Sequence, residues 1–314
     1  MIHTVGLNPA LDQTVTLDRL VVGEVNRATG TRTDPGGKSV NVASILSDWG
    51  LPVTVHGLLG AGNTDSFEAL FAQKHITDQM VRVPGLTRTN IKIVEPDGRT
   101  TDINLPGFDG DAEALYRLRF GLADVRGLVV VSGSQPARLQ AGATSDLIAG
   151  LIAQGAQVVL DVSGAPLKAA LEARALPHVI KPNQHELQDY TGTDLSNRTD
   201  LVAAGQALVA RGIGLVVISL GIDGAVFLTR DGGVQVAPVT LATGSTVGAG
   251  DAMVAGITAG LAEGLALPDL ARQATAFSGA KLQNPGPHLP SVETVRTLAS
   301  QITPRPVADW IAGA

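Results

Sequence analysis

Two short apolar runs place the strongest constraint on the fold of this chain. Leu128 to Val131 and Leu215 to Ile218 contain no polar residue in alternation. A strand with one face in water alternates polar and apolar side chains, so unbroken runs indicate strands that are covered on both faces. Helical patterns lie between such runs, for example near 144–153. The sequence therefore predicts an α/β fold with a largely parallel central sheet.

The same alternation of strands and helices runs through much of the chain, and polar residues follow several of the strands. Because parallel strands end at one edge of a sheet, these polar residues are expected to share one crevice and one site. The strands are expected at Ile2–Gly6, Val53–Leu58, Leu128–Val131, Val158–Asp161, Val179–Ile180 and Leu215–Ser219. The polar segments are Ser132–Ser134, Asp161–Ser163, Lys181–Asn183 and Ser219–Gly221.

Two polar strand pairs interrupt this pattern and predict a small separate sheet. Thr14–Leu17 and Val25–Thr31 alternate as strands with one exposed face do. Thr89–Val94 and Thr100–Asn104 are joined by the turn sequence Pro96-Asp97-Gly98. We expect a single domain over residues 1–314, with the strands of a β-lid drawn from about 12–33 and 88–105.

Composition excludes several classes of protein. The net charge of -6 and the absence of clustered Lys and Arg argue against a nucleic-acid surface. The chain has no cysteine, which rules out disulfides, thiolate nucleophiles and zinc knuckles. No run of about 18 apolar residues and no signal-peptide pattern occurs, so no membrane partner and a cytoplasmic location are expected.

The motifs of several other enzyme classes are also missing. The six histidines include no His-x-His or His-Glu-x-x-His spacing, and no Gly-x-Ser-x-Gly elbow occurs. The glycine pair Gly248 and Gly250 lacks the third glycine of a dinucleotide fingerprint and lies far from the first strand. A zinc cage, a hydrolase triad and a dehydrogenase are therefore all disfavoured.

The stretch Ser245–Met253 contains the most suggestive chemistry. Gly248, Ala249 and Gly250 form a turn that runs into a helical pattern, so their N–H groups are expected to form an anion hole at a positive helix end. A carboxylate, Asp251, follows directly. This pairing suits a phosphoryl group in transfer, with Asp251 as the base that deprotonates the attacking hydroxyl. The alternative is an Asp that is merely favourable in the first turn of a helix.

A second glycine turn precedes the first expected helix. Gly37-Lys38-Ser39 resembles part of a P-loop, but Arg32 stands where that motif needs a glycine. A lysine at a helix start could grip a phosphate or hydroxyls of a substrate. An ordinary turn with a solvated lysine is the alternative reading.

Eight segments in a fixed order resemble the PfkB branch of the ribokinase-like carbohydrate kinases, and most of all its 1-phosphofructokinase and tagatose-6-phosphate kinase subgroup. The likeness extends from Asn8 to about Gly286. Each motif is weak alone, but the ordered set is specific. The segments are Asn8–Asp12, Gly23–Arg27, Gly36–Ala43, Thr87–Lys92, Ser132–Ser134, Lys181–Glu186, Val217–Gly221 and Ser245–Asp251.

This resemblance implies a ribokinase-like three-layer α/β/α sandwich with a mostly parallel central sheet and a small β-sheet lid, which can join two copies into a homodimer. It implies ATP as phosphoryl donor and Mg²⁺ as cofactor. It also implies the following roles: Asp251 as base with the anion hole of Gly248, Ala249 and Gly250; Asp12, Gly37, Lys38 and Asn41 on sugar hydroxyls; Arg27, Arg88 and Ser134 on the substrate's phosphate; Lys181, Asn183, Ser219, Gly221, Thr246 and Asn284 around the nucleotide; and Glu186 with Asn183 organising magnesium through water.

Three positions depart from the family pattern and bear on the choice of sugar. Ser39 replaces a usual glycine, Gln135 begins an unusual Gln-Pro-Ala, and Leu105 takes a position that is often acidic. The favoured reaction converts D-fructose 1-phosphate to the 1,6-bisphosphate, with tagatose 6-phosphate or fructose 6-phosphate as alternative substrates. A kinase for a neutral sugar or nucleoside would leave Arg27, Arg88 and Lys38 without partners, and a non-catalytic sugar-phosphate sensor would not need Asp251.

Overall fold

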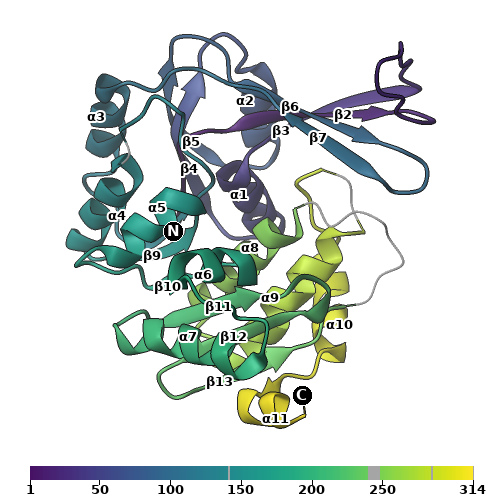
Figure 1. The fold of residues 1–314 in the computed structure, drawn as a ribbon. Coiled ribbons are helices and arrows are strands. Elements are labelled where there is room, and N and C mark those ends of the chain that lie inside the picture. The colour runs from purple at the N-terminus through teal and green to yellow at the C-terminus, as the bar shows by residue number, and fades with distance from the viewer. Residues whose placement is uncertain (141, 240–247, 284–285, 314) are drawn as a thin grey trace.

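The computed structural model describes residues 1–140, 142–239, 248–283 and 286–313, and at its centre lies a ten-stranded sheet (Figure 1). The strand order is β14-β13-β12-β11-β10-β9-β8-β1-β4-β5. Neighbours are parallel from β5 to β11, and β12, β13 and β14 add antiparallel pairs at one edge. The prediction of a mostly parallel sheet is confirmed. The strands are β1 (Ile2–Gly6), β4 (Val53–Gly60), β5 (Thr77–Val83), β8 (Gly127–Ser132), β9 (Ala156–Asp161), β10 (Val179–Ile180), β11 (Leu215–Ser219), β12 (Ala225–Thr229), β13 (Gly232–Val236) and β14 (Arg305–Pro306).

Helices cover both faces of this sheet and make a three-layer sandwich. One core cluster joins α1, α2, α8, α9 and α10 to the sheet, and a second joins α3 to α7 and α11 to its other face. The helices are α1 (Lys38–Asp48), α2 (Asp65–Gln73), α3 (Ala112–Gly121), α4 (Ala143–Ala153), α5 (Gly164–Glu172), α6 (Gln184–Thr191), α7 (Arg198–Ala210), η1 (Gly221–Asp223), α8 (Ala249–Ala262), α9 (Leu267–Lys281), α10 (Val292–Gln301) and α11 (Val307–Ala312).

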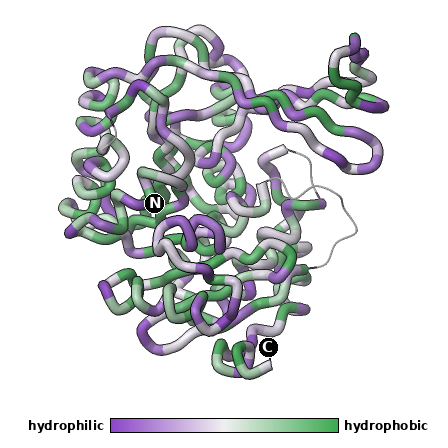
Figure 2. Tube along the Cα trace, viewed as in Figure 1, coloured by the Kyte–Doolittle hydropathy of each residue, from purple (hydrophilic) through white to green (hydrophobic). Residues whose placement is uncertain are grey.

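The apolar runs lie where the sequence places them. Val129 and Val130 on β8 point to opposite core clusters and are both fully buried, as are Val216 and Val217 on β11. Figure 2 shows these hydrophobic stretches along the central strands, with more hydrophilic residues on the outer helices. Covering both faces of each strand explains why neither run alternates with polar residues.

A four-stranded sheet of order β3-β2-β6-β7 forms the lid, which projects from the carboxyl edge of the main sheet (Figure 1). β2 and β3 lie in the chain between β1 and α1, and β6 and β7 lie between β5 and α3. These two strand pairs are the two excursions of the chain from the main sheet, and the parallel pairing of β2 with β6 joins them into one lid sheet. The lid strands are β2 (Ala10–Thr16), β3 (Gly30–Gly36), β6 (Arg88–Val94) and β7 (Thr100–Asn104).

The predicted bounds of the first pair of lid strands were wrong, since β2 begins at Ala10 and not at Thr14. The expected strand at Val25–Thr31 is irregular up to a bend at Thr29, and β3 begins only at Gly30. Asn26 explains the difference, because its side-chain amide bonds to the backbone of Val21 and Glu24 and closes a turn.

The tail of the chain, which the sequence left without an interpretation, completes one edge of the sandwich. β14 pairs with β13, and the indole of Trp310 on α11 is buried beneath the guanidinium of Arg198. Across the residues that the structure describes, no helix combines the length and apolar character required to cross a bilayer.

Candidate active site

The expected site residues gather where the parallel strands end and the lid begins. β8, β9, β10 and β11 each lead into one of the polar segments singled out above. The chain continues from β1 into the lid strand β2 at the same edge, and α8 contacts β8 and β9. Residues from distant parts of the chain therefore meet at one edge, as the sequence predicts.

Asp251 lies in the first turn of α8 and is 8% exposed. Gly248 caps this helix with a left-handed backbone, φ 79°, a conformation that glycine adopts without strain. The side-chain amide of Asn41 on α1 donates to Oδ2 of Asp251 at 2.8 Å. Burial, followed by the charge of Asp161, raises the pKa of Asp251 to about 6. The carboxylate is thus poised to accept a proton near neutral pH.

Asp161 joins two lysines beside Asp251 and is a functional candidate to which the sequence gave no role. Its carboxylate lies 3.0 Å from Nζ of Lys38 and 3.2 Å from Nζ of Lys181. Burial opposes its ionisation, but the two ammonium groups outweigh this and hold the pKa of Asp161 below its usual range. Its place at the end of β9, between two lysines of the same sheet edge, was the signal that could have identified it.

The residues expected on sugar hydroxyls come from the lid and from the turn before α1. Asp12 on β2 accepts a hydrogen bond from the side-chain amide of Asn90 at 3.0 Å, and burial raises the pKa of Asp12. Gly37 has φ 92°, and a Cβ there would lie 2.8 Å from Cα of Pro9. A glycine is required at this close approach, which brings the start of α1 against the loop after β1.

The loop after β1 also draws together two residues that were expected at the substrate's phosphate. Arg88 donates to the carbonyl oxygen of Asn8 at 3.2 Å, and the side chain of Asn8 donates to the hydroxyl of Ser134 at 3.0 Å. Arg27 is not part of this group. It lies in the exposed connection of residues 21–30 at the outer end of the lid, the purple loop in Figure 1.

Two residues expected to organise magnesium, Asn183 and Glu186, form a capping box at the start of α6. The backbone N–H of Glu186 donates to the Asn183 side chain at 2.8 Å, and the backbone N–H of Asn183 donates to Glu186 at 2.9 Å. Asn183 also forms an isolated parallel β-bridge with Ser219. Gly221, the first residue of η1, has a φ of 61°. Thr246 and Asn284 lie outside the described residues.

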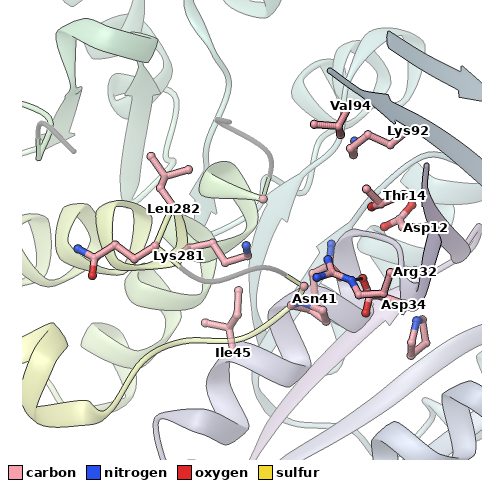
Figure 3. A pocket seen from close by; sticks show the side chains of 15 residues that line it. Asp12, Thr14, Arg32, Asp34, Asn41, Ile45, Lys92, Val94, Lys281 and Leu282 are labelled. Atoms are coloured by element: carbon pink, nitrogen blue, oxygen red, sulfur yellow. Dashed lines mark hydrogen bonds and ion pairs between the residues drawn. The ribbon is translucent and has the colours of Figure 1, made fainter. Parts of the chain in front are cut away.

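A cavity of about 290 Å³ lies between the lid, α1 and the end of α9 (Figure 3). Asp12 and Asn41 line it, together with three cations that the sequence analysis did not single out: Arg32, Lys92 and Lys281. Arg32 pairs with Asp34 at 2.7 Å and Lys92 with Asp102 at 2.8 Å. The cavity therefore combines acceptors for hydroxyl groups with three cations and two carboxylates, Asp12 and Asp34.

Comparisons with known proteins agree with this geometry. The profile of a family described as "pfkB family carbohydrate kinase" matches residues 6–294. A 1-phosphofructokinase of Xanthomonas campestris is 50% identical over 95% of this chain and 96% of its own, and one of Rhodobacter capsulatus is 43% identical over 96% of each. The crystal structure of phosphofructokinase-2 from Escherichia coli in complex with fructose-6-phosphate superposes with a TM-score of 0.88 at 27% identity, covering 96% of this chain and 98% of that one.

Proposed function

The chain belongs to the pfkB family of carbohydrate kinases, and from that premise we propose that it transfers the γ-phosphoryl group of ATP to D-fructose 1-phosphate. The product is D-fructose 1,6-bisphosphate. The choice of substrate is supported by the 1-phosphofructokinases that are 50% and 43% identical over nearly the whole chain. The observation that carries the chemistry is the buried carboxylate of Asp251 at the glycine turn of α8.

Asp251 acts as the general base in this proposal. It takes the proton of the acceptor hydroxyl, whose oxygen attacks the γ-phosphorus as the bond to the β–γ bridging oxygen breaks and ADP leaves. The N–H groups of Gly248, Ala249 and Gly250 face the transferring group at the positive end of α8. The hydrogen bond from Asn41 holds the Asp251 carboxylate in place before the substrate arrives.

The sugar phosphate lies between the lid and the sheet edge. Asp12, Gly37, Lys38 and Asn41 hold sugar hydroxyls, and Arg88 and Ser134 hold the existing phosphate, since both contact Asn8. A guanidinium suits a phosphate dianion because it offers parallel N–H donors. Lys38 also neutralises Asp161, so we expect it to serve the charge balance of the site as well as the sugar.

The nucleotide occupies the adjoining part of the edge. Its contacts are assigned to Lys181, Asn183, Ser219 and Gly221, and the assignment extends to Thr246 and Asn284. Lys181 is well placed for a phosphate oxygen, because a Cβ on Gly250 would lie 3.8 Å from its Nζ.

Magnesium is the expected cofactor, and the residues at this edge fit an ion that is held partly by water and by the substrate's phosphates. The described residues contain no group of three or more His, Asp or Glu side chains that would cage a metal. Mg²⁺ is commonly held by one or two carboxylates, waters and substrate phosphates, and Glu186 is the carboxylate beside Asn183 that would serve in this way. When bound with the nucleotide, the ion would neutralise phosphate charge.

Arg27 can join the site in a homodimer formed through the lids. Val21, Val22 and Val25 are exposed beside it, and Ile103 and Leu105 are exposed on the second excursion of the lid. Exposed apolar residues at several places on a projecting sheet favour an interface over an isolated lid. In such a dimer the outer end of one lid would approach the neighbouring copy, so Arg27 would act on the partner's substrate.

The function is tested by ATP-dependent turnover with magnesium against fructose 1-phosphate, tagatose 6-phosphate, fructose 6-phosphate, fructose and a nucleoside in parallel. We expect a clear preference for fructose 1-phosphate. A preference for another ketohexose phosphate would support the kinase activity and assign a different substrate to it. Turnover of a neutral acceptor alone would contradict the roles of Arg27 and Arg88, and ligand-induced thermal stabilisation without turnover would indicate a sensor.

A further inference from the structure

Ser39, which stands where a glycine is usual, is the second residue of α1 and is 2% exposed. From α1, Asn41 and Ile45 line the cavity between the lid and α9, whereas Ser39 does not. A side chain that is buried outside the cavity is poorly placed to contact a sugar with its hydroxyl. What the Ser39 side chain packs against therefore matters more than its hydroxyl.

The side chain of Ser39 packs on the end of β1, in the space that a larger residue at position 6 would need. A Cβ built on Gly6 would lie 1.9 Å from Oγ and 2.7 Å from Cβ of Ser39. The next atom outside the immediate chain neighbours of Gly6, the carbonyl oxygen of Ser132, would be in ordinary van der Waals contact at 3.7 Å. In the described part of the chain, Ser39 alone therefore excludes a side chain from position 6.

The backbone conformation of Gly6 does not itself require a glycine. Gly6 ends β1, pairs in parallel register with Gly57 of β4, and does not have a positive φ. Gly37 differs, because a φ of 92° and the backbone of Pro9 both exclude a Cβ there. The requirement at Gly6 is one of space only, and a substitution of the neighbouring side chain can remove it.

This contact lies immediately behind two residues of the candidate site. Lys38, which precedes Ser39, pairs with Asp161 at 3.0 Å. Asn41, two residues after Ser39, donates to Asp251 at 2.8 Å. Lys38, Ser39 and Asn41 share the first turn of α1, so a displacement of the serine moves the two site residues with it.

A methyl group at position 6 would displace the start of α1 far enough to affect catalysis. Carbon atoms in ordinary contact are about 3.5 to 4.0 Å apart, whereas a Cβ on Gly6 would lie 2.7 Å from that of Ser39. Relief of this clash moves the serine by about 1 Å. A misplacement of about 1 Å in a catalytic constellation can lower the rate about 100-fold.

We propose that Ser39 and Gly6 are paired positioning residues: the serine side chain rests on the bare backbone of β1 and thereby sets where α1 presents Lys38 and Asn41. The inference rests on the proposed kinase function and on no particular acceptor sugar. Neither residue of the pair contacts a substrate or moves a proton. The serine that departs from the family pattern is accommodated by a glycine in β1, so its effect on the sugar is indirect.

The test is a double-mutant cycle of Gly6→Ala and Ser39→Gly. Gly6→Ala should lower kcat/KM for fructose 1-phosphate about 100-fold, through both a lower kcat and a higher KM for the sugar, because Asn41 and Lys38 are displaced together. The KM for MgATP should stay within about threefold of wild type. Ser39→Gly removes the obstacle at the expense of a looser helix start, so it should stay within about tenfold of wild type, and the double variant should recover to that level.

Two results would overturn the proposal. One is a double variant that is no more active than Gly6→Ala. The other is a Gly6→Ala variant that unfolds more easily and yet keeps the kcat and the sugar KM of wild type, since the pair would then serve packing only. Should Gly6→Ala fail to fold, a folded and active double variant supports the pair, and a double variant that also fails to fold contradicts it.

Ser39→Ala distinguishes this role from a direct contact between the hydroxyl and the sugar. It keeps the Cβ, so we expect kcat and KM within about threefold of wild type. It should rescue Gly6→Ala only in part, because the two Cβ atoms still clash. A sugar KM raised as much in Ser39→Ala as in Ser39→Gly would assign the hydroxyl to the sugar and end the proposal.

Gly57→Ala is the matched control. A Cβ on Gly57 would lie 1.8 Å from the carbonyl oxygen of Gly6, and φ is 140°, so the obstacle there is backbone. Ser39→Gly should not restore this variant. Rescue of both glycine variants by Ser39→Gly would indicate a general loosening of the site and would contradict a specific pair.

Urea unfolding without substrates separates this inference from the kinase function. The destabilisation caused by Gly6→Ala should largely disappear when Ser39→Gly is also present. If the wild type turns over no acceptor, the proposed function fails, and the unfolding cycle still decides whether the two residues are coupled. Additive changes in unfolding free energy would count against the pair even in an active kinase.

Discussion

Asp251 owes its pKa of about 6 to burial and to the neighbouring charge of Asp161. The hydrogen bond from Asn41 and the ammonium groups of Lys38 and Lys181 act in the opposite direction. A general base is most effective when its pKa lies close to the working pH. Asn41 therefore sets part of the strength of the base as well as its position.

Replacing Asn41 should weaken catalysis at low pH. The variant Asn41→Leu removes the N–H that stabilises the ionised carboxylate, so the pKa of Asp251 rises and the acid limb of log kcat against pH moves to higher pH. The shift should be about one pH unit, since a hydrogen bond to a charged group contributes about 1.5 kcal/mol or more and one unit corresponds to about 1.4 kcal/mol. The measurement is kcat at saturating substrates over pH 5 to 9.

Asn90→Leu is the matched control for this experiment. It removes the hydrogen bond to Asp12 and leaves the partners of Asp251 in place. The substrate phosphate titrates near pH 6 in every variant, so a difference between variants reports on the protein. An acid limb at the same pH in Asn41→Leu and wild type would show that Asn41 does not tune the base.

Asp251→Asn should abolish turnover and make the unliganded protein more stable at neutral pH. The pKa of Asp251 is raised in the folded protein, so the native state holds its proton more tightly than the unfolded chain, and stability falls as pH rises from about 4 to about 6. The neutral variant avoids this loss, which is at most about 3 kcal/mol. Urea unfolding at pH 7.5 should show the gain, and the two proteins should converge near pH 4. A less stable variant at pH 7.5 would mean that Asp251 is structural.

The residues of the candidate site could be predicted in part from the sequence, but the residues that they contact could not. The glycine turn and Asp251 stand out in the sequence because a helix start and a carboxylate coincide there. The hydrogen bond between Asn41 and Asp251 joins residues 210 positions apart, and no local pattern encodes it. Lys281 was missed for the same reason, since only the packing of α9 against α8 brings it to the turn.

α6 connects helix capping with the nucleotide site. Its capping box uses Asn183 and Glu186, the residues expected to organise magnesium. Asn183→Ala should cost about 1 kcal/mol of unfolding free energy, because the N–H of Glu186 loses its acceptor. It should also lower kcat/KM for MgATP more than for the sugar phosphate. Urea unfolding and steady-state kinetics measure the two effects.

α7 offers a control, because the residue that caps it has no proposed role at the nucleotide. Asn197 caps it by accepting from the N–H of Asp200 at 2.8 Å, and both residues are exposed. Asn197→Ala should lose a similar free energy and keep full activity. If both variants lost stability alone, Asn183 would be a helix cap without a role at the nucleotide.

Among the elements, buried strands were predictable and lid strands less so. β8 and β11 could be predicted from their apolar runs, because a strand that is covered on both faces has apolar side chains at successive positions. β3 was placed several residues too early, since Asn26 turns the chain where the alternation of Val25–Thr31 suggests a strand. The alternation of a half-exposed strand carries less information than an apolar run, and one side-chain hydrogen bond can override it.

The proposed homodimer would form through the lid, the sheet that projects from the body of the molecule. Val22 is 93% and Val25 85% exposed at the outer end of the lid. The double variant Val22→Asp/Val25→Asp should convert a dimer to monomers in sedimentation velocity, because facing carboxylates cannot be buried without partners. It should also raise KM for the sugar phosphate through the loss of Arg27 from the neighbouring copy.

Phe120→Asp is the control for this variant. Phe120 is 76% exposed, but it lies on α3 and away from the lid. Its change should leave both the oligomeric state and KM as they are. A double variant that stays dimeric would place the interface elsewhere, and a monomeric variant with an unchanged KM would exclude Arg27 from the site.

The two excursions of the lid also bear on how the chain acquires its activity. β2 and β6 pair in parallel although Ala10 and Arg88 lie far apart in sequence, and β1, β4 and β5 must come together before these excursions can meet. Pairings that are distant in sequence close late, because the entropy of the intervening loop must be overcome first. During refolding, amide protons of β2 should thus become protected after those of β1 and β4. A nascent or half-folded chain would hold a formed sheet edge without a substrate site, so the last step of folding would also be the onset of catalysis.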